Sequence, residues 1–213
     1  MRVGVLFSGR GMNLKSIIER SLRLDSQYTV DYMITDNFRA PGRDYACDYS
    51  IQLRTLYNPS SRPWQEWEEE VAVCLREFKI DLVVLAGFMR ILHRPFCSEW
   101  EGRCLNIHPS LLPKYKGLHT HQRALKAGDD IHGCSVHFVT PELDDGPIVA
   151  QERVNIYPSD TEQSLATRVL EREVLLYPEV IQCIASGRIT ISDNKILFNR
   201  NTIESPLSLN ELL

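Results

Sequence analysis

The sequence lacks the basic excess and the long apolar runs that would assign it to a specialised class of protein. Its 213 residues carry a formal charge of −4, whereas a general nucleic-acid-binding surface needs an excess of lysine and arginine. Apolar residues make up 43% and charged residues 24% of the chain. These fractions are close to the average for soluble globular proteins, so we expect neither a disordered chain nor a membrane protein. A local anion site is compatible with this composition.

The six cysteines include no C-x-x-C pair. This spacing is typical of zinc and redox sites, so the cysteines indicate neither kind of site. Several lie in apolar runs, such as residues 71–75 and 133–139, where cysteine behaves as a small core hydrophobe. Scattered cysteines of this kind favour a reducing compartment. The N-terminus enters a strand-like run at Arg2 without the apolar segment and cleavage site of a secretory signal. We therefore expect a cytoplasmic protein.

Apolar runs of strand length alternate with helical periodicities along the chain. Strands are expected at residues 2–7, 29–35, 81–86, 104–108, 133–139 and 148–156. Helices are expected at about residues 14–22, 67–78 and 162–185. The last should be interrupted near Pro178, which has no backbone N–H. This alternation predicts an α/β fold with a Rossmann-like, mostly parallel sheet flanked by helices.

The chain carries no internal repeat, low-complexity run or linker. We therefore expect a single domain over residues 1–190, followed by a terminal hairpin and tail at 191–213. Residues 189–198, with 192–195 as the turn, have a pattern that is compatible with the hairpin. The last fifteen residues show no pattern that predicts structure.

The segment Ser8–Asn13 lies between the first strand and the first helix, where α/β sheets bind ligands. Gly9 and Gly11 allow a tight turn and close approach of backbone N–H groups to an anion. Asn13 can cap the helix or donate a side-chain hydrogen bond. The third glycine of a dinucleotide fingerprint is replaced by Leu14. The loop therefore favours a single phosphate over a pyrophosphate, with an ordinary glycine-containing turn as the alternative.

Asn106 and His108 are two residues apart in a strand-like run that Pro109 follows. Residues with this spacing project to the same face of a strand. An amide donor beside an imidazole is suited to stabilising a developing oxyanion, and the imidazole can also transfer protons near neutral pH. A histidine within a strand is, taken alone, more often structural.

Two loops after strands supply the other candidate groups. The acidic loop at residues 140–147 contains Asp144 and Asp145, and a carboxylate beside an imidazole would fix its orientation and raise its pKa. The alternative is a solvated acidic turn before Gly146. The loop at residues 88–92 offers apolar and backbone groups to a flat heteroaromatic ligand, although a plain loop would have the same appearance.

Taken together, these stretches resemble the phosphoribosylglycinamide formyltransferase family over roughly residues 1 to 190. The matching segments are VLAGFMRIL at Val84–Leu92, LNIHPSLLPKYKGLHTH at Leu105–His121 and HGCSVHFVTPELDDGPIVAQ at His132–Gln151. The Asn-x-His-Pro-Ser-Leu-Leu-Pro run is typical of folate-dependent formyl transfer. Its Lys-Tyr-x-Gly-x-x-Thr-His continuation is typical of the branch that acts on glycinamide ribonucleotide.

The resemblance implies transfer of a formyl group from 10-formyltetrahydrofolate, a co-substrate, to the amine of glycinamide ribonucleotide in purine biosynthesis. It implies that Asn106, His108 and Asp144 carry catalysis. The N-terminal half would bind phosphate, and the C-terminal half would bind folate and carry the catalytic residues. Both partners are small molecules, with no nucleic acid or membrane, and the sequence leaves the oligomeric state open.

The resemblance also implies the binding residues. The substrate phosphate would be held by Gly11, Met12 and Asn13. The folate would be contacted by Met89, Arg90, Ile91, Leu92, Asn106, Thr140 and Asp144. Glu173 matches a family contact to the substrate. It also lies on an otherwise apolar stripe of the predicted helix, where burial of a carboxylate is unfavourable unless a partner binds it. That stripe consists of Leu165, Val169, Glu173, Tyr177 and Ile181.

At two positions the chain departs from the family pattern. Met12 stands where the family usually has serine or threonine, so backbone N–H groups must replace a hydroxyl donor. Trp64 stands where the family has a folate-binding arginine, and Arg62 is close enough in sequence to substitute. His119 and His121 have the spacing of a metal pair without further convincing ligands, so no metal is expected.

Parts of the sequence are also compatible with other functions. A formyltransferase acting on an aminoacyl-tRNA should bring an extra C-terminal domain and a basic surface, and one acting on an amino sugar is a further variant. A folate deformylase should differ from Pro109 after the histidine. A nucleotide-binding dehydrogenase would bind the cofactor ribose through Asp36. It would also need the third glycine of the dinucleotide fingerprint, which this chain lacks. A non-catalytic ligand-binding module would follow if Met12 marked a decayed site.

Overall fold

The computed structural model describes residues 1–57, 62–192 and 195–213 and divides the chain into two compact units, Met1–Leu105 and Asn106–Leu213. The single domain over residues 1–190 stays a prediction. Each unit has its own buried apolar core. Among the described residues, no helix is both long and apolar enough to cross a membrane.

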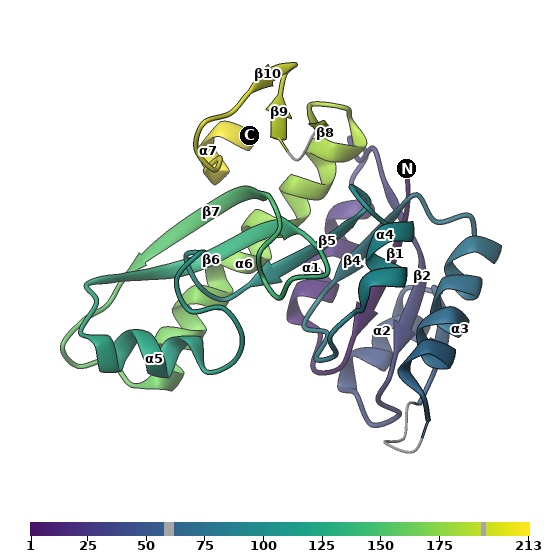
Figure 1. The fold of residues 1–213 in the computed structure, drawn as a ribbon, viewed down its shortest axis with the longest axis horizontal. Coiled ribbons are helices and arrows are strands. Elements are labelled where there is room, and N and C mark those ends of the chain that lie inside the picture. The colour runs from purple at the N-terminus through teal and green to yellow at the C-terminus, as the bar shows by residue number, and fades with distance from the viewer. Residues whose placement is uncertain (58–61, 193–194) are drawn as a thin grey trace. The chain divides into compact units, whose positions relative to one another are not determined.

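The N-terminal unit is an alternation of strands and helices (Figure 1). Its strands are β1 Arg2–Phe7, β2 Thr29–Thr35, β3 Gln52–Thr55 and β4 Leu82–Leu85, and β5 Cys104–His108 begins in it. Its helices are α1 Met12–Ser21, the short 3-10 helix η1 Pro41–Arg43, α2 Asp44–Asp48, α3 Trp64–Glu77 and α4 Arg94–Glu99. Strands β3, β2, β1 and β4 are neighbours in this order and pair in parallel.

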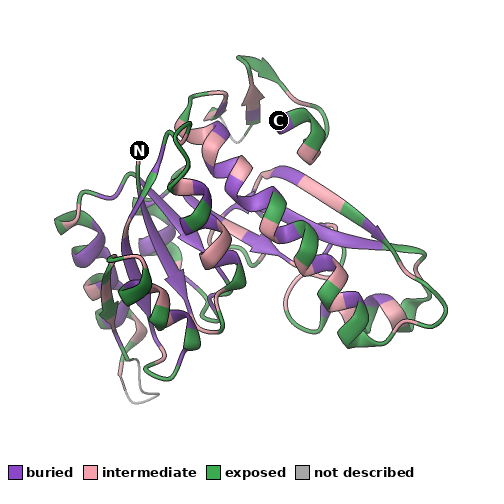
Figure 2. Cartoon of the chain, turned by 180° about the vertical axis from the view of Figure 1, so that it is seen from behind, coloured by how far each residue is buried: buried purple, intermediate pink, exposed green. Residues whose placement is uncertain are grey.

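Burial explains why β1 and β4 read as continuous apolar runs. Five of the six residues of β1 and all four of β4 are buried, as the colouring of the inner strands of this unit in Figure 2 shows. A parallel strand is covered on both faces, so it needs apolar residues throughout. Gly4 allows α3 to pack closely, because a Cβ there would lie 2.8 Å from Leu75 Cδ2.

The C-terminal unit is built around an antiparallel pair and one long helix. Its strands after β5 are β6 Ile131–Phe138, β7 Ile148–Asn155, β8 Ile189–Ser192, β9 Lys195–Phe198 and β10 Asn201–Thr202. Its helices are α5 Thr120–Ala127, α6 Glu162–Ala185 and α7 Leu209–Leu212. Strand β6 lies between β5 and β7, and α6 packs against β6 and β7 (Figure 1). Because β3, β2, β1 and β4 pair in parallel and β6 and β7 pair antiparallel, the seven-stranded sheet is mostly parallel, as the sequence predicted.

Helix α6 runs through Pro178 without a break, so the predicted interruption is wrong. Pro178 is buried, as are its neighbours Tyr177 and Ile181. The proline removes one hydrogen bond within the helix, but the buried face holds the helix against β6 and β7. A capping box between Thr161 and Ser164 fixes the start of α6.

The predicted terminal hairpin is present, because β8 and β9 pair antiparallel from Ile189 with Phe198 to Ser192 with Lys195. Of the predicted turn at residues 192–195, Ser192 and Lys195 are paired strand residues, and residues 193–194 lie outside the described residues. The tail, for which the sequence predicted nothing, forms β10 beside β9 and then returns to β7. There the Leu207 N–H donates to the Val149 carbonyl at 3.0 Å, and the Gln151 N–H donates to the Leu207 carbonyl at 2.8 Å.

Candidate active site

The loop after β1 presents backbone groups at the start of α1. Gly11 is the N-cap with a left-handed φ of 74°, and no described side chain caps this helix end. Of the two roles expected for Asn13, capping is wrong, because α1 begins at Met12 and places Asn13 in its first turn. The first N–H groups of a helix lack acceptors within it and favour an anion. Met12 is 45% exposed beside them.

The loop after β4 is tied to the loop after β1 within the N-terminal unit. The Met89 N–H donates to Ser8 Oγ at 3.0 Å. Arg90 Nε donates to the buried Asp36 Oδ2 at 2.7 Å. Of the four apolar side chains in this loop, Met89 and Ile91 are exposed, whereas Phe88 and Leu92 are buried. The predicted folate residues therefore lie on an anchored loop with an exposed apolar surface.

The two departures from the family pattern have definite places in the N-terminal unit. Trp64 stacks on His93, with ring centroids 3.8 Å apart. Arg62 donates to Glu70 Oε2 at 2.8 Å. A folate carboxylate at Arg62 would therefore have to compete with Glu70.

In the C-terminal unit, three predicted residues meet in one cluster with a fourth that the sequence analysis did not single out. His108 Nδ1 lies 3.4 Å from Asp144 Oδ2. Asn106 Nδ2 lies 3.2 Å from His137 Nε2, which is 3.6 Å from Asp144 Oδ1. The His108, His137 and Asp144 side chains are less than a tenth exposed. The cluster combines an amide donor, two imidazoles and a carboxylate away from bulk water.

His108 faces hydrogen-bond acceptors on both sides of its ring. Its Nε2 lies 3.0 Å from the Tyr115 carbonyl oxygen, and its Nδ1 faces Asp144. Both contacts can be donations only when the ring carries two protons. Asp144, which has a left-handed φ of 49°, also accepts the Gly117 N–H at 2.9 Å. The backbone of this loop and the Asp144 carboxylate thus fix the orientation of the His108 ring.

His137 is held as a neutral ring. Burial lowers its pKa, and its Nδ1 lies 2.9 Å from the Phe138 carbonyl, to which it donates. Its Nε2 is then left to accept from Asn106. The sequence offered one indication of His137: it is a histidine near the end of an apolar strand, just before the acidic loop at residues 140–147.

The remaining predicted residues are placed as follows. Thr140 Oγ1 donates to the Glu142 carbonyl within the acidic loop at 3.2 Å. Glu173 is 7% exposed on the buried face of α6. Burial and then the nearby Glu173 charge raise the pKa of the Cys134 thiol, which places the carboxylate close to β6. Lys116 contacts Asp145, the acid that follows Asp144 in the loop.

The histidines of the candidate metal pair take different positions. His119 is the exposed N-cap of α5, whereas His121 Nδ1 lies 3.2 Å from His132 Nε2. Burial and next the His121 charge lower the pKa of His132 to about 4. Over residues 1–57, 62–192 and 195–213, no group of three or more potential ligands is arranged to hold a metal.

The mostly parallel sheet and the strand that carries Asn106 and His108 are the features that place this chain in a known class of enzymes. Comparison with known proteins identifies that class. The family model described as "Formyl transferase" matches residues 1–181, and the chain belongs to this family. The chain is 42% identical over 194 residues to the phosphoribosylglycinamide formyltransferase of Escherichia coli strain K12, covering 91% of this chain and 92% of that protein. The enzyme of the same name from Haemophilus influenzae is 39% identical over 193 residues, covering 91% of both.

A solved structure gives the same relationship. The phosphoribosylglycinamide formyltransferase of Coxiella burnetii superposes with a TM-score of 0.92 at 37% identity and covers 98% of both chains. The resemblance predicted from the sequence, and the fold predicted with it, are confirmed.

Proposed function

We propose that this chain transfers the formyl group of 10-formyltetrahydrofolate to the amine of glycinamide ribonucleotide, a step of de novo purine biosynthesis, in the cytoplasm. The carrying observation is the 42% identity to the Escherichia coli enzyme over nearly the whole of both chains. The Asn106, His108 and Asp144 cluster supplies the groups that this chemistry needs.

In the reaction, the substrate amine attacks the formyl carbon and forms a carbon–nitrogen bond. The carbonyl electron pair moves to oxygen and gives a tetrahedral oxyanion. When this collapses, the bond from the formyl carbon to the folate nitrogen breaks, and a proton passes from the substrate nitrogen to the folate nitrogen. Every atom is accounted for without a covalent enzyme intermediate.

Asn106 and doubly protonated His108 stabilise the oxyanion in this proposal. The 3.4 Å separation of His108 Nδ1 from Asp144 is longer than the 2.7–2.9 Å typical of a charge-assisted hydrogen bond. The Nδ1–H is therefore available to a stronger acceptor such as an oxyanion. Asp144 keeps His108 charged and assists removal of the amine proton through water.

The substrate phosphate binds at Gly11, Met12 and Asn13 in this proposal, and Glu173 contacts the substrate. The support for the phosphate site is the start of α1, whose first N–H groups follow a left-handed Gly11. The support for Glu173 is a carboxylate buried on an apolar helix face. The folate contacts in this proposal are the seven residues that the family resemblance implies. Four of them follow β4 in the N-terminal unit, namely Met89, Arg90, Ile91 and Leu92, and three lie in the C-terminal unit, namely Asn106, Thr140 and Asp144.

Steady-state turnover with both substrates tests the proposal. We expect formylated glycinamide ribonucleotide and tetrahydrofolate in equal amounts. Two parallel reactions serve as controls: one without an amine acceptor reports deformylation, and one with an aminoacyl-tRNA reports the other transferase class. Formate release that is independent of the acceptor, or preference for the tRNA, would refute the assignment.

A further inference from the structure

The ring of His108 is held from outside the catalytic cluster by the backbone of a neighbouring loop. Its Nε2 faces the Tyr115 carbonyl oxygen at 3.0 Å. Tyr115 has a left-handed φ of 58°, which a residue with a large side chain rarely adopts without support from its surroundings. The position of this carbonyl therefore depends on what holds the Tyr115 side chain.

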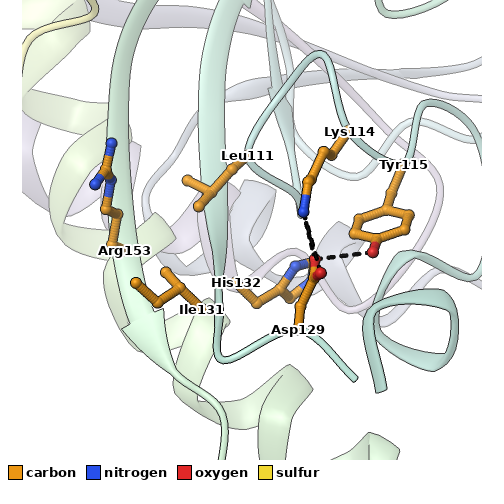
Figure 3. Close-up of a pocket in the computed structure, with 7 residues that line it drawn as sticks. All are labelled: Leu111, Lys114, Tyr115, Asp129, Ile131, His132 and Arg153. Atoms are coloured by element: carbon orange, nitrogen blue, oxygen red, sulfur yellow. Dashed lines mark hydrogen bonds and ion pairs between the residues drawn. The ribbon is translucent and has the colours of Figure 1, made fainter. Parts of the chain in front are cut away.

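Asp129 holds that side chain (Figure 3). The Tyr115 hydroxyl donates to Asp129 Oδ2 at 2.8 Å, and Lys114 Nζ donates to both carboxylate oxygens, at 2.9 and 3.1 Å. The Arg123 guanidinium lies 5.3 Å from the centroid of the Tyr115 ring. His132 meets that ring edge-on, with centroids 6.1 Å apart. The tyrosine is thus fixed at its hydroxyl and along its ring.

The charge on Asp129 is secured by the same contacts. The hydrogen bond from Lys114, and next that from Tyr115, lower the pKa of the Asp129 carboxyl. An ionised acceptor makes a stronger hydrogen bond to the hydroxyl than a neutral one would. Asp129 remains a charged anchor at neutral pH.

The loop also reaches the second member of the pair. Two residues after Tyr115, the Gly117 N–H donates to Asp144 Oδ2 at 2.9 Å. The same short segment therefore orients the outer nitrogen of His108 and the carboxylate that faces its inner nitrogen. A shift of Tyr115 would disturb both contacts together.

We infer that Asp129, through the Tyr115 hydroxyl, is a positioning residue for the His108–Asp144 pair. Asp129 itself acts without touching the reacting atoms: it fixes the Tyr115 carbonyl against His108 Nε2 and thereby holds the ring in its orientation, with a proton on Nε2. This inference rests on the proposed role of His108 in formyl transfer.

Three variants test it: Tyr115→Phe, which removes only the hydroxyl, Asp129→Ala, and the double variant. We expect each single variant to lose about tenfold in kcat, with the KM of both substrates changed less than about twofold. The double variant should be no worse than either single variant, because both remove the same link. Asp130→Asn is the matched control, an exposed acid next in sequence, and it should retain wild-type kcat.

A second readout is independent of substrate. Nitrogen-15 spectra of the His108 ring in the unliganded chain report whether both nitrogens carry protons. At one fixed pH, Tyr115→Phe and Asp129→Ala should lower the fraction of His108 rings that carry a proton on Nε2, and Asp130→Asn should not. An unchanged His108 ring in folded Tyr115→Phe would overturn the inference, as would additive losses in the double variant.

The two proposals fail in different ways. If the wild-type chain formylates no glycinamide ribonucleotide, the proposed function fails, and the ring spectra still decide whether Asp129 positions His108. If turnover is normal and the spectra of the variants match wild type, only the positioning inference fails.

Discussion

The loop after β1 and the cluster around His108 are built from different parts of the chain. The first offers backbone N–H groups at a helix start set by Gly11. The second is made of interlocked side chains, Asn106, His108, His137 and Asp144. A backbone site depends on conformation and tolerates changes of side chain, such as methionine at position 12. A side-chain site depends on the identity of each residue. The predictions below test this contrast.

The largest effect is expected at His108. His108→Ala removes the proposed donor to the oxyanion and should lower kcat by about 10²–10⁴-fold, the usual contribution of such a group, while the thermal midpoint stays close to wild type. His119→Asn is the control, because His119 is exposed with a left-handed φ of 58° that asparagine tolerates. Near-normal turnover in His108→Ala would show that the side-chain site does not depend on the identity of this residue, and the contrast with the backbone site would be wrong.

The backbone site should be most sensitive at Gly11. A Cβ there lies 3.3 Å from Leu14 atoms, and the φ of 74° is unfavourable for a β-branched residue. Gly11→Val should weaken glycinamide ribonucleotide binding by about 100-fold, through the loss of hydrogen bonds to the phosphate worth roughly 1.5–3 kcal/mol each. Gly11→Asn, which accepts this φ, should lose much less. Titration calorimetry decides, and equal affinity in a folded Gly11→Val chain would place the phosphate elsewhere.

The titratable side chains of the C-terminal unit should also govern its acid stability. The pKa of His132 is about 4 against an ordinary value of 6.5. Between these values the unfolded chain binds more protons, so stability falls as the pH falls. The two values give a loss of about 2 kcal/mol from pH 8 to pH 5.

Guanidinium unfolding at both pH values measures this loss. His132→Gln should reduce the pH dependence by about that amount, whereas His119→Asn should keep the wild-type slope. An identical slope in His132→Gln would show that His132 does not stay neutral in the folded chain.

A smaller effect is expected from the buried carboxylate on α6. Glu173→Gln should raise the KM for glycinamide ribonucleotide by about tenfold, as expected for one hydrogen bond to a charged group, with the folate KM unchanged. Glu171→Gln, exposed on the same helix, is the control. A changed thermal midpoint with both KM values unaltered would identify Glu173 as structural.

The smallest effect is expected where the backbone site departs from its family. Met12→Ser restores a hydroxyl at a half-exposed position, so it should tighten substrate binding by about 1.5 kcal/mol or less, that is, about tenfold at most. Calorimetry with glycinamide ribonucleotide measures it. A much larger gain would show that the backbone groups alone hold the phosphate poorly.

The sequence predicted the buried strands well because their burial leaves a continuous apolar pattern. Strands β1, β2 and β5 have the predicted bounds. Strand β3 was missed because its four residues alternate between exposed and half-buried positions. Pro178 was misjudged because local propensity does not include the packing of α6 against β6 and β7.

For the candidate site, spacing and resemblance identified Asn106, His108 and Asp144, which the fold brings together. His137 joins them through the pairing of neighbouring strands, which one strand's sequence does not reveal. The contact from the Tyr115 carbonyl was also beyond prediction, since it is a backbone contact set by a loop conformation. Roles carried by backbone geometry leave little trace in residue identity.

The return of the tail to β7 has a consequence for how the chain behaves in concentrated solution. Strand β7 is the last strand of its sheet, and an open strand edge invites pairing with other molecules. Leu207 occupies part of that edge with two backbone hydrogen bonds, and the Leu209 N–H adds a third contact to Glu152 at 2.8 Å. The segment thus covers part of the edge of β7 and limits edge-to-edge aggregation. Truncation of the chain before Leu207 would expose this edge to pairing with other molecules.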